Sequence, residues 1–151
     1  MKSIHIIAVG KHKEKNLLEL EADYLKRTKT FKIQIHEVKN FDDQKDLEAS
    51  EVLAKIKSLG LKNPYVVTLE ERGREYDSPK FSKWLTTKLE AGAELCLVLG
   101  GAAGHGEKLL EIKKEAISLG KLTYPHKIAR LLLVEQLYRA ETISEGHPYH
   151  K

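Results

Sequence analysis

The sequence has little cysteine, little proline and few aromatic residues. Of its 151 residues, one is cysteine and four are proline. The single cysteine, Cys96, has no partner for a disulfide within the chain, and it lies in the apolar run Leu95-Cys96-Leu97-Val98-Leu99. A small apolar side chain in such a run suits a buried strand, so we expect Cys96 to be an inert part of the core.

Long hydrophobic runs are also absent. No apolar stretch approaches the roughly 20 residues that a membrane-spanning helix needs. Near the N-terminus, Lys2 leads directly into Ile4-His5-Ile6-Ile7, which is too short and too polar for a signal peptide. The chain has no internal repeat and no low-complexity segment. We therefore expect a single domain, residues 1–151, located in the cytoplasm.

Neither sign of charge dominates the chain. Its 26 lysines and arginines stand against 22 aspartates and glutamates, a net charge of +4. This mild excess is compatible with a phosphate-bearing partner such as a nucleic acid. A charged surface that only interacts with water explains it equally well.

Hydrophobic periodicity predicts alternating strands and helices. Two of the strands are apolar throughout, as in sheets covered on both faces, so the pattern indicates an α/β fold with a mostly parallel sheet flanked by helices. The residues between the third strand and the third helix are charged and predict a loop, with Ser78 as the N-cap of that helix. The expected strands are 3–9, 31–38, 65–69 and 95–99, the expected helices begin near 16, 46, 78, 107 and 127, and the charged loop is 70–77.

A glycine-rich loop follows the strand that ends at Leu99. In parallel sheets, ligands bind where loops leave the carboxyl ends of strands, which directs attention to the loops after Leu69 and Leu99. The second loop has glycine at 100, 101, 104 and 106. It is not a P-loop, because Glu107 takes the lysine position, and its glycine spacing does not match a dinucleotide-binding fingerprint. It serves either as a ligand loop or as a flexible connector.

The helix expected at 127–143 carries apolar residues on all sides. A helix of this kind must be covered on more than one side. We expect a second subunit to supply part of that cover, which predicts a homodimer with this helix in the interface. Glu135 and Arg139 lie four residues apart on it and can form an ion pair.

The chain continues into the tail His147-Pro148-Tyr149-His150-Lys151. Pro148 restricts the backbone and so lowers the entropic cost of fixing the neighbouring side chains against a partner. The tail is either such a docking segment or a disordered basic end.

Several of these segments together resemble one family. They are Val67-Thr68-Leu69, Gly100-Gly101, Thr123-Tyr124-Pro125-His126, Glu135-Gln136-Leu137-Tyr138-Arg139-Ala140 and His147-Pro148-Tyr149-His150. The likeness is to the RlmH family, the 23S rRNA pseudouridine-N3 methyltransferases of the SPOUT superfamily, and covers nearly the whole chain. The tail and the Tyr-Arg-Ala segment are its specific parts.

The resemblance implies a trefoil-knotted α/β fold, with the knot and the cofactor pocket in about 65–151. It also implies a homodimer, S-adenosylmethionine as methyl donor, no metal, and a pseudouridine of 23S rRNA in the assembled 70S ribosome as substrate. Carried over by position, the cofactor would contact Leu69, Gly100, Gly101, Leu119, Gly120, Lys121, Leu122, Thr123 and Tyr124.

For the chemistry, we expect His150 to act as the general base or to position the target base. Arg139 would stabilise developing negative charge, and Tyr149 would stack on or hydrogen-bond the base. His126 and His147 are weaker candidates. The chain departs from the family pattern at Ala102-Ala103, at Tyr124 and at Glu141, and none of these positions removes a group that the chemistry needs.

Two other functions compete with methyl transfer. A metal hydrolase could use His126, His147 and His150, but two histidines three residues apart without a nearby carboxylate or cysteine are a weak zinc signature. A non-catalytic RNA-binding or ribosome-assembly protein would explain the charge and the tail. It would not explain the glycine loop.

Overall fold

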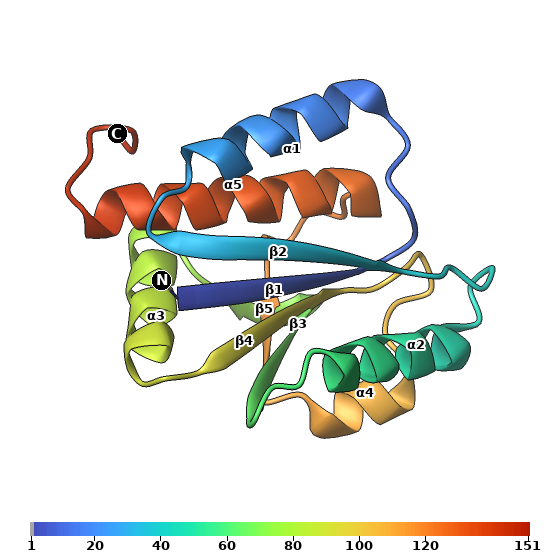
Figure 1. Ribbon diagram of the computed structural model, residues 1–151. Helices are drawn as coiled ribbons and strands as arrows, with labels where there is room; N and C mark the ends of the chain where they lie inside the picture. The colour runs from blue at the N-terminus through green and yellow to red at the C-terminus, as the bar shows by residue number, and fades with distance from the viewer. Residues whose placement is uncertain (1) are drawn as a thin grey trace.

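The structure, a computed structural model, describes residues 2–151 (Figure 1). Met1, the first residue of the expected domain, lies outside the described residues. Five strands form one parallel sheet in the order β2-β1-β4-β3-β5, which confirms the predicted fold class. The elements are β1 (Lys2–Val9), α1 (Lys15–Arg27), β2 (Phe31–Val38), α2 (Lys45–Ser58), β3 (Pro64–Glu75), α3 (Ser78–Glu90), β4 (Glu94–Leu99), α4 (Glu107–Ile112), β5 (Glu115–Ser118) and α5 (His126–Ser144).

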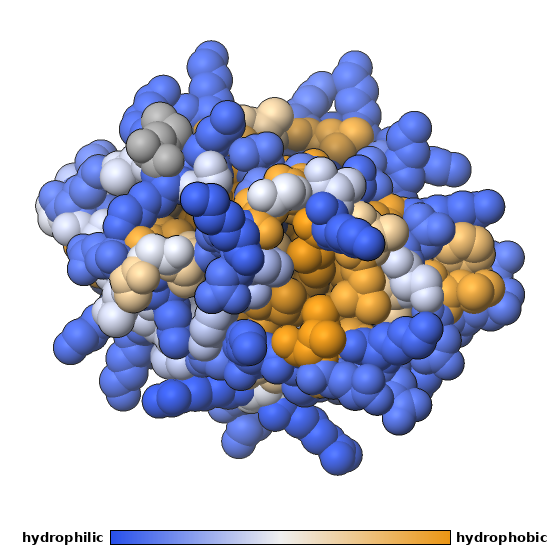
Figure 2. All heavy atoms as spheres, turned by 60° about the horizontal axis from the view of Figure 1, so that its bottom comes forward, coloured by the Kyte–Doolittle hydropathy of each residue, from blue (hydrophilic) through white to orange (hydrophobic). Residues whose placement is uncertain are grey.

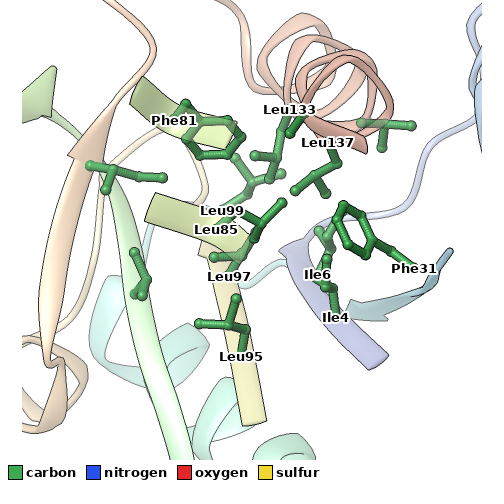
Figure 3. Packing of buried hydrophobic residues seen from close by; sticks show 14 of the residues in the cluster. Ile4, Ile6, Phe31, Phe81, Leu85, Leu95, Leu97, Leu99, Leu133 and Leu137 are labelled. Atoms are coloured by element: carbon green, nitrogen blue, oxygen red, sulfur yellow. The ribbon is translucent and has the colours of Figure 1, made fainter. Parts of the chain in front are cut away.

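Helices cover both faces of the sheet. Successive strand residues point to opposite faces, so Ile4 and Ile6 of β1 enter one core while Ile7 enters the other. The first core joins the sheet to α3 and α5 and includes Phe81, Leu133 and other residues labelled in Figure 3. Helices α2 and α4 cover the opposite face, as Figure 1 shows below the sheet.

Cys96 belongs to the core between the sheet and α2. It is fully buried, and burial raises the pKa of its thiol to about 12. The thiolate, which is the reactive form, is therefore scarce at neutral pH. This confirms that Cys96 is buried and supports its role as an inert core residue.

Apolar side chains also reach the surface on the side of α2 and α4. Figure 2 views this side and shows apolar atoms gathered in a hollow among hydrophilic side chains. Leu47 of α2 and Ile112 of α4 are among the exposed large apolar residues of the described chain.

Strand β3 extends further than expected. The predicted charged loop at 70–77 is wrong, because β3 continues to Glu75. β5 pairs with β3 on both sides of an irregularity, with Leu69 and Arg74 both opposite Ile117. Gly73 makes the close approach possible, since a Cβ there would lie 2.6 Å from the carbonyl carbon of Ile117. The charged residues 70–75 therefore continue β3 and do not form a loop.

Two helix starts and one short strand near the site also differ from expectation. Asp77, not Ser78, is the N-cap of α3, and its carboxylate accepts a hydrogen bond from the backbone N–H of Lys80 at 2.9 Å. β5 was not predicted, because its four residues are too few for a periodic signal. Pro125 is the N-cap of α5, which begins one residue earlier than the sequence predicts.

Other elements of the same chain cover more of helix α5 than its apolar pattern predicts. The helix packs on the sheet and lies beside α1 and α3 (Figure 1). Part of its all-round apolar character therefore has an intramolecular cause. Ile128, Leu131 and Leu132 stay only partly buried. The homodimer and the trefoil knot both remain predictions.

Among the described residues, no helix combines the length and the apolar character needed to cross a membrane.

Glu141, one of the departures from the family pattern, has a structural role. The residue is 3% exposed, and its carboxylate accepts hydrogen bonds from the backbone N–H groups of Lys29, Thr30 and Phe31, where the chain enters β2. We expect Glu141→Ala to destabilise the fold by about 2–3 kcal/mol, because buried N–H groups lose their acceptor. Urea unfolding measures the change, with Glu111→Ala on the exposed side of α4 as control. Equal stability of the two variants would contradict this role.

Candidate functional site

A cavity of about 730 Å³ opens at the carboxyl ends of β4 and β5, beside the irregularity in β3. It is lined by Leu99 and Ser118, the last residues of β4 and β5, and by Leu69, which lies at the irregularity in β3. The glycine loop and the residues before α5 complete its wall. Its position is the one where ligands bind to open parallel sheets, and its volume suits a small-molecule cofactor.

The glycine loop is compact because its backbone folds back on itself. The backbone N–H of Gly104 donates to the carbonyl oxygen of Gly101 at 3.0 Å. A Cβ on Gly100 would lie 3.0 Å from the oxygen of Gly104, and one on Gly101 would lie 3.0 Å from Oε1 of Glu48. Glycine at both positions lets the main chain line the cavity directly.

His105 ties this loop to β3. Its Nε2 lies 2.9 Å from the carbonyl oxygen of Leu69, so Nε2 carries the proton and donates. Burial lowers the pKa of the ring, which favours the neutral form. The other nitrogen, Nδ1, is then a buried acceptor without a partner among the described residues. The sequence pattern alone does not predict a role for His105, although its place in the glycine loop is a usable signal.

A carboxylate also borders the cavity. Glu70 accepts hydrogen bonds from the hydroxyl of Thr68 at 2.5 Å and from Nζ of Lys113 at 2.7 Å. Burial alone would raise the pKa of Glu70, but these bonds lower it, so the group is ionised at neutral pH. Because Lys113 neutralises Glu70, the acidic charge at this border of the cavity comes from Glu71.

The structure brings together eight of the nine residues expected to bind the cofactor. Lys121 is exposed and does not line the cavity. The side chain of Lys121 therefore has no place in the wall, although its neighbours do. The eight that line it are Leu69, Gly100, Gly101, Leu119, Gly120, Leu122, Thr123 and Tyr124.

The expected catalytic residues form a second group, at the end of α5. Arg139 donates from Nε to Oε1 of Glu135 at 2.9 Å and from Nη1 to Nδ1 of His150 at 3.0 Å. The hydroxyl of Tyr149 donates to the same Glu135 oxygen at 3.1 Å. The tail is thus folded against α5 in a defined arrangement. The expected Glu135–Arg139 ion pair is present.

Aromatic contacts hold the tail in this position. The ring of Tyr149 meets the ring of Tyr138 edge-on, with centroids 4.8 Å apart, and the guanidinium of Arg139 lies 4.8 Å from its centroid. Arg27 of α1 lies 4.7 Å from the centroid of Tyr138. Burial and the bond to Glu135 raise the pKa of Tyr149, so its hydroxyl stays protonated.

The two groups do not meet within one chain. His126, at the start of α5, lines the cavity, whereas Arg139 lies thirteen residues further along the same helix. At 1.5 Å per residue this separates them by about 20 Å. Figure 1 shows the tail curled at the far end of α5. His126 is therefore also distant from His147 and His150, and the described residues contain no cluster of histidine, cysteine or carboxylate side chains suited to a metal ion.

Comparison with known proteins identifies the family. The family model described as a predicted SPOUT methyltransferase matches residues 1–150. The chain belongs to the SPOUT methyltransferase family. Members of this family use a methyl donor, and the cavity at the strand ends is the place in this chain that could hold one.

Similar proteins carry a common name. A protein of Prochlorococcus marinus (strain NATL1A) named ribosomal RNA large subunit methyltransferase H is 42% identical over 97% of this chain and 94% of its own length. A protein of the same name from Clostridium botulinum (strain Eklund 17B / Type B) is 36% identical over 99% of both chains. Another, from Enterococcus faecalis (strain ATCC 700802 / V583), is 37% identical over 98% of this chain and 99% of its own.

Proposed function

We propose that this methyltransferase transfers a methyl group from S-adenosylmethionine to N3 of a pseudouridine in 23S rRNA. The observation that carries the proposal is the cavity at the strand ends of a chain that matches large-subunit rRNA methyltransferases over nearly its whole length. The substrate is the assembled 70S ribosome, and the reaction takes place in the cytoplasm. The chain acts as a homodimer and as a single domain.

The chemistry of the cavity suits S-adenosylmethionine. Leu69, Leu99 and Leu119 offer apolar surface for an adenine ring, and the exposed backbone of the glycine loop offers donors and acceptors. The carboxylate of Glu71, which forms no ion pair among the described residues, favours a ligand with positive charge, which a sulfonium and an ammonium group provide. The unpartnered Nδ1 of His105 can accept one hydrogen bond from the ligand.

A dimer would bring the cavity of one chain close to the tail of the other. If two α5 helices pack antiparallel, the end of one lies beside the start of the other, and the tail of one chain reaches the cavity of its partner. The partly buried Ile128, Leu131 and Leu132 provide apolar surface for such packing. Each active site would then combine the cavity of one chain with Arg139, Tyr149 and His150 of the other.

In this composite site, Arg139 and the tail contact the target base. When bound, S-adenosylmethionine would supply an electrophilic methyl group and would itself be left as a neutral thioether. Arg139 stabilises the negative charge that develops as N3 loses its proton, and Tyr149 packs against the base. In the single chain, Nδ1 of His150 accepts a hydrogen bond from Nη1 of Arg139, so the ring proton lies on Nε2. Once Arg139 turns to the substrate, Nδ1 of His150 is free to take the N3 proton.

A methyl-transfer assay tests the proposed function. Purified protein and labelled S-adenosylmethionine are incubated with intact 70S ribosomes, separated subunits or naked rRNA, and the modified base is then mapped. We expect methylation of a pseudouridine at N3, with 70S ribosomes as the best substrate. Binding of RNA without binding of S-adenosylmethionine would instead favour a non-catalytic role in ribosome assembly.

A further inference from the structure

A second, smaller cavity adjoins the first. Its volume is about 180 Å³, below the range of typical ligand pockets, and it shares Leu99, Gly100 and His126 with the larger cavity. It lies between the carboxyl ends of β1 and β4, where α1 and α5 begin. Its size suits a fragment of a larger ligand that also occupies the neighbouring site.

His12 lines this cavity and lacks hydrogen-bond partners. His12 is buried, with 9% of the residue exposed. Neither ring nitrogen has a hydrogen-bond partner among the described residues. Its backbone N–H donates to Oε2 of Glu37 at 2.9 Å, which fixes its position. Burial and the charge of Arg130 lower the pKa of the ring, so the neutral form predominates. A neutral imidazole presents one donor and one acceptor, and a hydroxyl group satisfies both kinds of bond.

The rim of the cavity carries positive charge that no ion pair neutralises. Arg130 is balanced by Glu21 and Glu37, and Lys127 pairs with Glu14. Lys11 and Lys13 are exposed and form no ion pair within the described part of the chain.

The starts of the two helices add to this positive character. The N-cap residues of α1 and α5 make no side-chain capping bond, which leaves backbone N–H groups directed toward this end of the sheet. An anion at the rim would meet both lysines and the positive ends of two helix dipoles.

We propose that the second cavity binds one ribose–phosphate unit of RNA beside the target nucleotide. His12 contacts the ribose 2′-hydroxyl, and Lys11 and Lys13 contact the phosphate. The inference rests on the proposed function in that RNA is the substrate. It adds a place in the chain where RNA is distinguished from DNA, because only RNA carries the 2′-hydroxyl.

Oligonucleotide binding tests the role of His12. Fluorescence anisotropy compares single-stranded RNA and DNA of the same sequence with the wild type, His12→Leu and His12→Gln. We expect the wild type to prefer RNA, His12→Leu to lose about tenfold in RNA affinity with little change for DNA, and His12→Gln to recover part of the preference, since an amide keeps a donor and an acceptor. An undiminished RNA preference in His12→Leu would overturn the inference.

Salt dependence tests the two lysines. Loss of the contact to one phosphate should reduce the slope of log affinity against log salt by about 0.7 for a single strand. Lys11→Gln/Lys13→Gln is compared with Lys57→Gln/Lys62→Gln, which removes the same charge at the opposite end of the sheet. Equal slopes in the two variants would count against the site.

These readouts separate the inference from the proposed function. On ribosomes, His12→Leu should raise KM about tenfold while calorimetry shows unchanged cofactor binding. If the wild type methylates no ribosomal substrate, the proposed function fails, and the oligonucleotide experiments still decide whether the second cavity reads ribose.

Discussion

Deletion of residues 147–151 is expected to lower methyl transfer to ribosomes by about 10²–10⁴-fold, the contribution of a positioned acid or base. The deletion removes His150 and Tyr149, the groups that contact Arg139 and Glu135 in the folded tail. Cofactor binding should remain, because the cavity wall is formed by residues that precede the tail, and the tail is proposed to contact the target base rather than the cofactor. A methyl-transfer assay on 70S ribosomes and calorimetry with S-adenosylmethionine measure the two effects. Retained activity would refute a catalytic role for the tail.

A mixed dimer shows whether the tail acts on the partner. Thr123 is exposed and lines the cavity, so Thr123→Trp should fill the cofactor site without disturbing the core. Neither Thr123→Trp nor the tail deletion should be active alone. When the two variants are combined, one site per dimer pairs an intact cavity with an intact tail, and activity should return. If each tail served its own cavity, the mixture would stay inactive.

Replacement of Arg130 by methionine is expected to destabilise the fold by about 3–5 kcal/mol. Arg130 donates to both oxygens of Glu21, at 2.8 and 2.9 Å, and to Oε2 of Glu37 at 2.6 Å. Its side chain is 8% exposed and that of Glu21 is 5% exposed, so the change leaves a buried carboxylate without its counter-ion. Urea unfolding measures the loss.

Two comparisons make this experiment specific. Arg72→Met removes an exposed arginine and should change stability by less than about 0.5 kcal/mol. Arg130→Met/Glu21→Leu removes both buried charges and should recover much of the loss, because an apolar pair can replace a buried ion pair at little cost. A loss below about 1 kcal/mol in Arg130→Met would show that the ion pair is not a major support of the fold.

Periodicity in the sequence was sufficient to predict the order of most elements and the parallel sheet. It failed where residues of the sheet are charged or where an element is very short. The segment from Glu70 to Glu75 resembles a loop in composition, but it forms strand because β5 pairs with it on both sides of the irregularity and Gly73 lets the two backbones approach. That cause lies in β5, more than forty residues further along the chain.

The cavity was foreseen mainly through the family resemblance. Parallel-sheet physics indicated the loops after Leu69 and Leu99, and the resemblance supplied the residues of 119–124. His12 and His105 were not singled out, because their importance comes from burial and from missing partners that only the tertiary structure reveals. The distance between the cavity and the tail likewise depends on the full length of α5.

The length of helix α5 consequently sets the distance between the cavity and the tail of one chain. The helix carries His126 at the cavity and Arg139 at the tail on one rigid rod, with its far end anchored to the start of β2 by Glu141. One residue inserted between them would advance the tail by about 1.5 Å and turn it by about 100°. Repacking can accommodate substitutions within this stretch. A change in its length would instead shift and rotate the tail relative to the cavity.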